Sequence, residues 1–573
     1  FQFGSLRCVK QHGVSAFYLH TLFSTRLMTT TTTTVMIRSC ILGIYFFQIG
    51  MKCSCAERIF EEIHFTQEAC NQLGYPDDFE ACAQIEFCTS PDGYRHLDVS
   101  GHVENNIEDL EQSFVEEVQQ AEHKESKSST SKNQNMQPIP NKAKYGWRLP
   151  GSPVCSWPGP IMRLKRGIHH GLFVRGSDSA TNMHFHGLHI PGYGNGDNMY
   201  RSIQGQDNIM IYGLQLPEDQ HLGGTHWYHS HLKGQSWDQV MGGAFGMIVI
   251  DDNGHDVGTE DENVLKFLTN EKILIFDNAD GNWRANGAFL EKFHFVKDEW
   301  YRLRILAVNL DSHSDQEIIN FSSGCLVHAL AHDGIFNFEV PSNAIKSTVL
   351  TSSSRIDVAI QCSTDSKISL NNYYTLVNIQ VDDTTPPTTA TPWEDEGTKS
   401  WNSTRLTYVG DLRDMEPSHY WRVEIDETNI NQIGESRHIP LCDDNGNDFT
   451  YGTVVEMQLV GAETHPFHMH IFPMQVISSG CGSGHIVGEF YDTIVTADRD
   501  DRIPCILRFR LVDITGPTLV HCHIFEHAEH GAIGWFNVVG GPSKIGKDQQ
   551  PTCQKGSTCT EFDNDSLPMC NDR

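Results

Sequence analysis

Runs of apolar, β-branched and aromatic residues recur along the chain from about residue 145 onward, and Gly, Asp and Asn turns separate them. Clear examples are FGMIVI at 245–250, YRLRIL at 301–306 and ILRFR at 506–510. Short strands punctuated by turn residues are typical of β-sandwich proteins. The pattern therefore predicts an all-β protein.

Other segments break this pattern. An apolar run at 41–47 follows Arg38 and has the length of a signal-peptide core, too short to predict a transmembrane helix. Residues 101–143 are polar and poor in aromatics, which is typical of a solvated linker. The predicted organisation is a leader (1–55), a Cys-rich N-terminal segment (56–100), the linker (101–143), three β-domains (144–255, 256–415 and 416–548) and a Cys-containing tail (549–573).

Composition limits the number of domains, the possible partners and the cellular compartment. A chain of 573 residues is long enough for three or four domains. Its formal net charge of -31 argues against nucleic acid or an anionic membrane surface as partner. Its 17 cysteines favour an oxidising compartment, and many of them can pair in disulfides. Glycosylation triplets at Asn320, Asn402 and Asn564 agree with secretion to the cell exterior, and no stable membrane insertion is expected.

Ten histidines and one cysteine gather in four short motifs, HFHG (184–187), HSH (229–231), HPFHMH (465–470) and HCHIFEH (521–527). Successive side chains of a β-strand point to opposite faces, so both histidines of a His-x-His pair project to one side and can bind adjacent metal ions. A single pair would more often be a solvated or core histidine, or a zinc ligand. The four pairs supply eight ligands: His184, His186, His229, His231, His468, His470, His521 and His523.

The same alternation turns Cys522 to the other face of its strand, toward a second metal site. His465 and His527 are the motif histidines that remain to join it. A trigonal set of two imidazoles and one thiolate is typical of blue copper. We interpret the other histidines of note as structural: His169, His170, His226, His328 and His332.

These motifs resemble those of the multicopper oxidases, the family of laccases, bilirubin oxidases and ferroxidases. The resemblance spans roughly residues 144–545. It includes THWYHSH at 225–231, NGDN at 195–198, Gly242, Gly243 and PMQV at 473–476, and it is nearer to the bacterial-type three-domain branch than to fungal laccases. It implies three cupredoxin-like Greek-key β-sandwich domains.

The resemblance also implies a role for each motif residue and a cofactor of four copper ions. His465, Cys522 and His527 would hold the type 1 copper, and His184 and His468 the type 2 copper. Asp197 matches a carboxylate that helps to deliver protons to oxygen. The type 3 pair would take six histidines: His186, His229, His231, His470, His521 and His523.

The two halves of this ligand set lie at 184–231 and 465–523, with no His-x-His pair between them. This spacing predicts a cluster at the interface of the first and third domains, with the middle domain as a spacer. Within that spacer, RIDV at 355–358 and HDG at 332–334 resemble the ligand-free second domain of three-domain relatives.

Two positions depart from the family pattern. The axial position, ten residues after the cysteine, holds Ala532 in place of Met or Leu. An alanine cannot coordinate, and loss of an axial thioether is expected to raise the copper potential. The residue after His527 is Ala528, where some relatives carry a proton-relay acid, so Glu526 or Glu529 would have to replace it.

The expected reaction is one-electron oxidation of a reducing substrate at the type 1 copper, coupled to four-electron reduction of dioxygen to water. Cys522 would pass electrons through the backbone to His521 and His523. Three hypotheses for the function remain open. The first is a laccase-like oxidase of phenols or aromatic amines. The second is a ferroxidase or other metal-ion oxidase, and the third is a non-enzymatic copper-binding protein. Carboxylates that would suit the second are Glu463, Asp498, Asp500 and Asp501.

Overall fold

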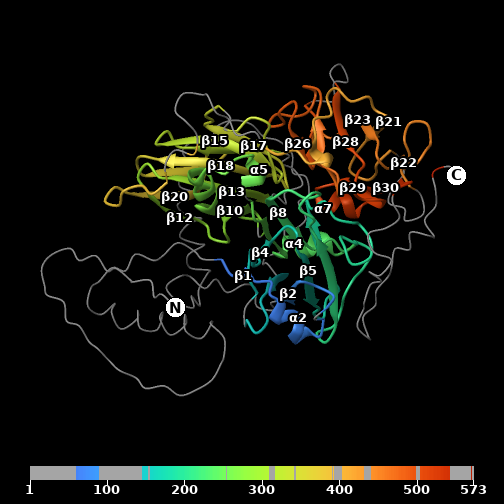
Figure 1. Cartoon of the computed structure of the whole chain (residues 1–573), viewed down its shortest axis with the longest axis horizontal. Coiled ribbons are helices and arrows are strands. Elements are labelled where there is room, and N and C mark those ends of the chain that lie inside the picture. The colour runs from blue at the N-terminus through green and yellow to red at the C-terminus, as the bar shows by residue number, and fades with distance from the viewer. Residues whose placement is uncertain are drawn as a thin grey trace, which may run out of the picture. The chain divides into compact units, whose positions relative to one another are not determined.

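The strands of the described residues form six sheets, which pair into three sandwiches (Figure 1). This computed structural model describes residues 60–75, 77–89, 145–152, 155–252, 254–279, 281–308, 316–340, 343–389, 392, 403–431, 440–497, 504–541 and 570. The predicted leader, the linker and nearly all of the tail lie outside these residues. No described helix is both long and apolar enough to cross a membrane.

The first sandwich packs a five-stranded sheet, in the order β1-β4-β9-β8-β6, against a four-stranded sheet, β3-β2-β5-β7. Its core is a cluster of buried apolar side chains from both sheets, with Trp147 and Phe185 among them. The strands are β1 (Glu62–Ile63), β2 (Ala81–Thr89), β3 (Tyr145–Arg148), β4 (Ile161–Leu164), β5 (His169–Arg175), β6 (His184–His186), β7 (Ile209–Gln215), β8 (Gly224–His229) and β9 (Phe245–Ile250). Two helices belong to this region, α2 (Gln67–Leu73) and α4 (Ser236–Met241).

The first sandwich begins earlier in the chain than the expected range of 144–255. Strand β1 pairs in parallel with β4, and β2 lies between β3 and β5. Disulfide Cys70–Cys82 lies within this N-terminal segment, and disulfide Cys88–Cys155 links the segment to the rest of the sandwich. The reason is burial, because Ile85 and Phe87 of β2 are core residues of this sandwich. Much of the Cys-rich segment is thus part of the first domain.

The second sandwich contains a six-stranded sheet, β11-β10-β13-β18-β15-β16, and a five-stranded sheet, β12-β20-β19-β14-β17. Strand β13 is buried along its whole length, although its sequence includes the charged residues Arg302 and Arg304. The strands are β10 (Glu271–Asp277), β11 (Arg284–Ala285), β12 (Glu291–Val296), β13 (Trp300–Val308), β14 (Glu317–Phe321), β15 (Cys325–His332), β16 (Ile335–Phe336), β17 (Ser347–Leu350), β18 (Arg355–Cys362), β19 (Ser366–Leu370) and β20 (Tyr374–Asp382). Helices α5 (Gly254–Val257) and α6 (Glu262–Thr269) precede them, and η2 (Thr407–Val409) follows.

The third sandwich contains two five-stranded sheets, β21-β23-β28-β25-β26 and β22-β30-β29-β24-β27. Its core includes both Cys522 and Ala532. The strands are β21 (His419–Glu424), β22 (Phe449–Thr450), β23 (Val454–Val460), β24 (Phe467–Met469), β25 (Met474–Val476), β26 (Phe490–Tyr491), β27 (Thr493–Ile494), β28 (Cys505–Arg510), β29 (Gly516–Cys522) and β30 (Ile533–Val539). Helix α7 (Phe525–Glu529) follows β29 directly.

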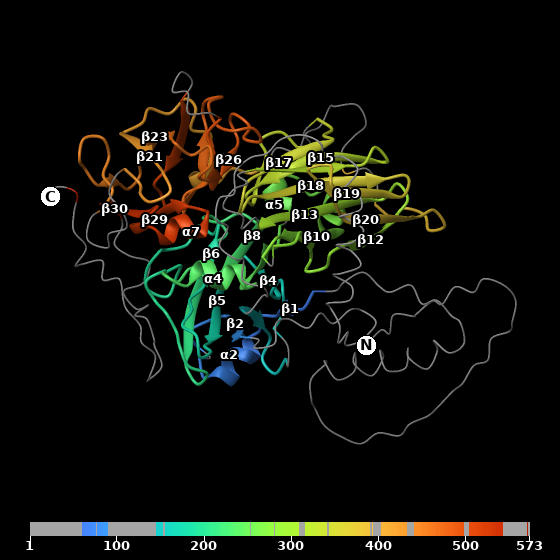
Figure 2. The ribbon, with the colours of Figure 1, turned by 180° about the vertical axis from the view of Figure 1, so that it is seen from behind.

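The three sandwiches meet around β8, α4 and α7, which lie together in both views of the molecule (Figures 1 and 2). An apolar cluster joins the sandwiches here, with Trp227 from the first, Leu306 from the second and Phe525 from the third. Helix α7 also contacts α4, because the Glu529 carboxylate accepts hydrogen bonds from Ser236 Oγ and Trp237 N at 2.9 and 3.0 Å.

The structure confirms the expected all-β, β-sandwich architecture. It also shows that cysteines pair, as expected: the described residues contain five disulfides, and Cys522 takes part in none of them.

Candidate metal centre

The first two histidine motifs lie on neighbouring strands of the first sandwich. His184 and His186 are the ends of β6, and antiparallel pairing places His184 opposite His229 of β8. His231 follows two residues after β8 ends. All four side chains are buried, so they project inward rather than to solvent.

The last two motifs lie on neighbouring strands of the third sandwich. Strands β24 and β29 are antiparallel, and their register sets His468 opposite His521 and Phe467 opposite Cys522. His470 and His523 lie just beyond the ends of these strands. The alternation of side chains along β29 separates Cys522 from its two histidine neighbours, as the sequence predicted.

The eight paired histidines converge across the junction of the first and third sandwiches. They form three groups whose ligand atoms lie within 4.8 Å of one another. Two groups contain the six histidines to which the family resemblance assigns a type 3 role, and the third contains both histidines assigned to type 2. The groups are His186, His229 and His523; His231, His470 and His521; and His184, His186 and His468.

The ring nitrogens inside these groups fit metal ions. Several buried nitrogens have no hydrogen-bond partner: His184 Nε2, His186 Nδ1, His229 Nε2, His468 Nε2 and both ring nitrogens of His523. In another group, His521 Nε2 lies 3.0 Å from His231 Nε2 and 3.1 Å from His470 Nε2. Because buried polar atoms are rarely left without a partner, these inward-facing imidazoles with available lone pairs are a donor set that fits metal ions.

Burial also keeps the imidazoles neutral. The pKa of His184 is lowered well below 6.5 by burial and by His470, and that of His468 by burial and by His470. Burial and His470 lower the pKa of His231 to about 3. A metal ligand must be deprotonated, so these shifts prepare the rings for coordination. The pKa is lowered well below 6.5, with burial as the largest cause, in four more: His186, His229, His521 and His523.

Hydrogen bonds on the far side of the rings set their orientation. Asp197, which is buried, lies with its carboxylate 2.8 Å from His184 Nδ1 and 3.1 Å from His470 Nδ1. Backbone carbonyl oxygens hold Nδ1 of His229 and His521, each at 2.9 Å. Such partners fix the tautomer of a ligating histidine. Asp197 therefore connects one ligand of the first sandwich to one of the third.

His465, Cys522 and His527 form a fourth group nearby. The Nδ1 atoms of the two histidines are 3.1 Å apart, and they lie 3.9 and 3.7 Å from the Cys522 Sγ. Soft thiolate with two imidazoles is the donor set of a blue-copper site. Cys522 lies between His521 and His523, so the backbone connects it to one histidine of the His231 group and one histidine of the His229 group.

The carboxylates that the sequence suggests for metal-ion oxidation or proton relay lie in several separate environments. Glu463 lines a cavity of about 270 Å³, together with Gln316, Gly482, Ser483, Thr496 and Ala497. Glu529 is engaged by α4, as described above, and Glu526 is half-buried at the start of α7. Asp498, Asp500 and Asp501 lie outside the described residues. The histidines interpreted as structural are in none of the metal groups found among the described residues: His169, His170, His226, His328 and His332.

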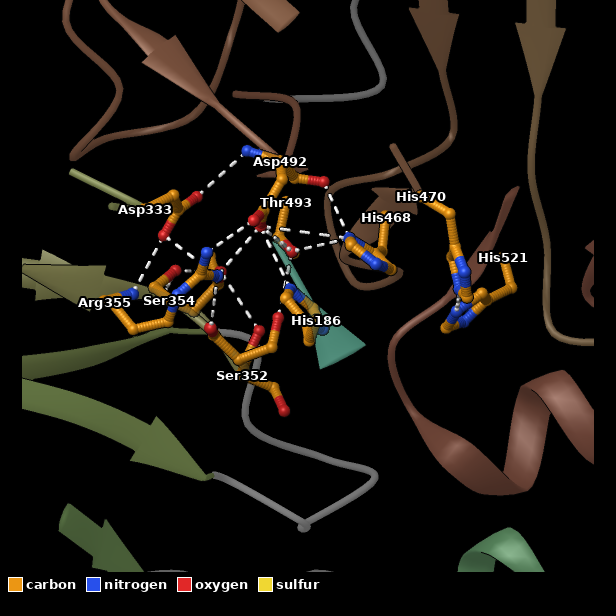
Figure 3. Close-up of polar contacts among 12 residues, drawn as sticks. His186, Asp333, Ser352, Ser354, Arg355, His468, His470, Asp492, Thr493 and His521 are labelled. Atoms are coloured by element: carbon orange, nitrogen blue, oxygen red, sulfur yellow. Dashed lines mark hydrogen bonds and ion pairs between the residues drawn. The ribbon is translucent and has the colours of Figure 1, made fainter. Parts of the chain in front are cut away.

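Sequence reasoning missed one carboxylate. The side chain of Asp492 reaches the ring of His186, and its backbone oxygen reaches His468 Nδ1 (Figure 3). Arg355 of the second sandwich binds the same carboxylate. The sequence marks RIDV only by its resemblance to the second domain of relatives, and no local pattern marks Asp492 as a partner of the candidate ligands.

Comparisons with known proteins indicate the family of this chain. Residues 135–255 and 414–541 each match the sequence profile described as multicopper oxidase. The "Multicopper oxidase mco" of Staphylococcus epidermidis is 23% identical over 406 residues, covering 66% of this chain and 82% of that protein. An iron transport multicopper oxidase of Candida albicans is 32% identical over 115 residues, covering 19% of this chain and only 17% of that protein.

Solved structures show the same fold. A laccase from Pediococcus acidilactici matches with a TM-score of 0.58 and 14% identity, covering 86% of this chain and 95% of that one. The multicopper oxidase from Campylobacter jejuni, described as a metallo-oxidase, matches with a TM-score of 0.53 and 19% identity over 69% and 87% of the two chains. Fold and site thus define a copper-dependent oxidoreductase. The chain belongs to the multicopper oxidase family.

Proposed function

We propose that this chain couples one-electron oxidation of a donor to reduction of dioxygen to water, using four copper ions. When bound, copper supplies the redox chemistry at both sites. The observation that carries the proposal is the position of Cys522, between a ligand of each all-type-3 group. The backbone from Cys522 to His521 and His523 gives electrons a covalent path from the donor side to the oxygen side.

The assignment of ligands follows the groups. His465, Cys522 and His527 would hold the type 1 ion, and His184 and His468 the type 2 ion. The remaining six histidines would hold the type 3 pair: His186, His229, His231, His470, His521 and His523.

Asp197 would act at the trinuclear site, where oxygen is reduced. Its carboxylate is buried and accepts from the backbone N–H of Phe185 at 2.9 Å as well as bonding two ligand rings. These contacts hold its carboxylate beside two candidate ligand rings, where the family resemblance expects a carboxylate that helps to deliver protons. We assign proton delivery to Asp197 on that basis.

For the donor, the sequence put phenols or aromatic amines first and metal ions second. A phenol needs an apolar groove beside His465. The Glu463 cavity is instead lined mainly by polar residues, and Glu463 is two residues from His465. Thr496 Oγ1 donates to the Glu463 carboxylate at 3.4 Å. A carboxylate in a small polar cavity favours a cation such as Fe(II).

The relatives divide in the same way. The names of some refer to iron transport, as in Candida albicans, whereas others are called laccases, as in Pediococcus acidilactici. The Glu463 cavity therefore leads us to place metal-ion oxidation ahead of phenol oxidation. A non-enzymatic copper-binding role is disfavoured because every ligand position is filled.

Secretion is part of the proposal. Five disulfides suit an oxidising compartment, and the triplet at Asn320 lies on a partly exposed strand position. The apolar run at 41–47 and the triplets at Asn402 and Asn564 lie outside the described residues.

The test compares steady-state oxygen uptake with Fe(II) and with a phenol, in the parent chain and in Glu463→Gln. We expect a several-fold higher KM for Fe(II) in the variant and little change for the phenol. Glu456→Gln is the matched control, since Glu456 pairs with Arg508 on the same sandwich. Unchanged Fe(II) kinetics would exclude Glu463 as a cation site, and absence of oxygen uptake by copper-loaded parent protein would exclude the oxidase itself.

A further inference from the structure

Arg355 is a fully buried cation at the start of β18 in the second sandwich. Its guanidinium forms two hydrogen bonds with the Asp492 carboxylate, with Nη1 2.9 Å from Oδ1 and Nη2 2.5 Å from Oδ2 (Figure 3). Asp492 belongs to the third sandwich. A forked contact of this kind fixes the plane of a carboxylate as well as its position.

Asp492 in turn contacts two metal ligands. Its Oδ1 lies 3.0 Å from His186 Nε2, and its backbone oxygen lies 2.9 Å from His468 Nδ1. With Nε2 of His186 engaged by the carboxylate, Nδ1 is the nitrogen left for a metal ion. It is buried and has no hydrogen-bond partner. The side chain of Asp492 therefore sets which nitrogen of His186 faces the cluster.

Further hydrogen bonds fix the positions of Arg355 and Asp492 relative to each other. The Asp333 carboxylate accepts from the backbone N–H of Arg355 at 2.9 Å and from that of Asp492 at 3.1 Å. The Ser353 carbonyl oxygen accepts from Arg355 Nη1 at 3.0 Å. The Thr225 carbonyl oxygen, on strand β8 of the first sandwich, accepts from Arg355 Nε at 3.3 Å. Arg355 thus contacts all three sandwiches beside the cluster.

A purely stabilising ion pair would explain these contacts less well. Desolvation of two buried charges offsets much of their attraction, so a buried pair contributes little net stability over apolar residues of similar size. What the pair does supply is geometry, because the oxygen that binds Arg355 Nη1 is the same oxygen that binds His186. A carboxylate released by Arg355 could rotate and leave the His186 ring without its partner.

We propose that Arg355 is a positioning residue of the trinuclear copper site, acting through Asp492 on the orientation and tautomer of His186. The inference rests on the proposed copper function. It gives the second sandwich a role in building the cluster, although that sandwich contributes no member of the metal groups found among the described residues.

The test measures copper binding and blue absorption together in the full-length chain. Arg355→Lys keeps a positive charge but removes the fork. We expect copper to bind the cluster about 10- to 100-fold more weakly in this variant, the range found when partners of ligating histidines are changed. Blue absorption from Cys522 should persist. The matched control is Arg302→Lys, because Arg302 is equally buried between Asp252 and Asp357 but its ion pairs reach no ligand histidine.

A second variant distinguishes loss of positioning from loss of folding. Arg355→Met combined with Asp492→Leu and Asp333→Asn removes the buried cation together with both carboxylates that pair with it. We expect a folded, blue protein with the same selective loss of cluster copper. If both Arg355 variants bind copper as tightly as the parent and differ only in a lower unfolding temperature, Arg355 contributes to stability alone. That result would overturn the proposal. Failure of the parent chain to fill the cluster would instead refute the proposed function.

Discussion

Cys522 and Ala532 lie directly opposite each other across two adjacent antiparallel segments. The Cys522 N–H donates to the Ala532 carbonyl oxygen at 2.9 Å, and the Ala532 N–H donates to the His527 carbonyl oxygen at 3.0 Å. Residues opposite each other on antiparallel strands project to the same face. Ala532 is fully buried, so its methyl group belongs to the same core as the cysteine sulfur.

Ala532→Met should lower the reduction potential of the type 1 copper, because the variant offers a thioether at the axial position. A redox titration of the blue absorption measures the shift. Ala532→Leu is the matched control, since leucine adds similar bulk without a donor atom. Both variants overpack the core and should lose about 1–3 kcal/mol of stability. Equal potentials in the Met and Leu variants would show that residue 532 does not face the copper.

Cys522→Ser should abolish the blue absorption, because that absorption depends on the thiolate–copper bond. The eight histidines of the trinuclear groups keep their positions, so most of the remaining copper should stay bound. Optical absorption and copper content of the same sample provide the measurement. A serine variant that remained blue would refute the placement of the type 1 site.

His468→Ala should retain the blue absorption and reduce oxygen uptake by more than about 100-fold. His468 belongs to the group of His184 and His186, whereas His465 belongs to that of Cys522. Addition of donor should still bleach the blue colour once. His294→Ala is the control, because His294 lies on β12 and in none of the described metal groups. Loss of both colour and activity would mean that His465 and His468 have exchanged roles.

Glu271→Gln should destabilise the chain in a pH-dependent manner. Burial raises the pKa of Glu271, but Arg304 and Arg163 outweigh that effect and hold it at about 2, below the ordinary 4.5. The charged carboxylate therefore stabilises the fold above pH 4.5, by on the order of 3 kcal/mol. This contribution declines as pH falls below 4.5 and is lost through pH 2.

Thermal unfolding of the parent and variant between pH 7 and pH 2 tests the Glu271 prediction. The difference in unfolding temperature should be largest near neutral pH and should narrow steadily on acidification. In Glu456→Gln, which removes a partly exposed ion pair with Arg508, the difference should be small throughout. A gap between parent and Glu271→Gln that is independent of pH would contradict the assignment.

The sequence by itself predicted the metal-binding residues and determined the class of protein. The two-residue period of a β-strand is a local property, so His-x-His pairs could be predicted as metal ligands before any fold was known. The same local reasoning separated Cys522 from His521 and His523, and it predicted the all-β architecture from short apolar runs. The family resemblance then supplied the division of the ligands between copper types.

Only the tertiary structure decided which partners meet across the sandwiches. The contact of His186 with Asp492 joins residues 306 positions apart, and that of Arg355 with Asp492 joins residues 137 apart. Strand β2 likewise enters the first sandwich beside β5, although the predicted domain boundary excluded it. Such contacts depend on how whole sheets pack, because side-chain periodicity specifies the face on which a residue lies but not what covers that face.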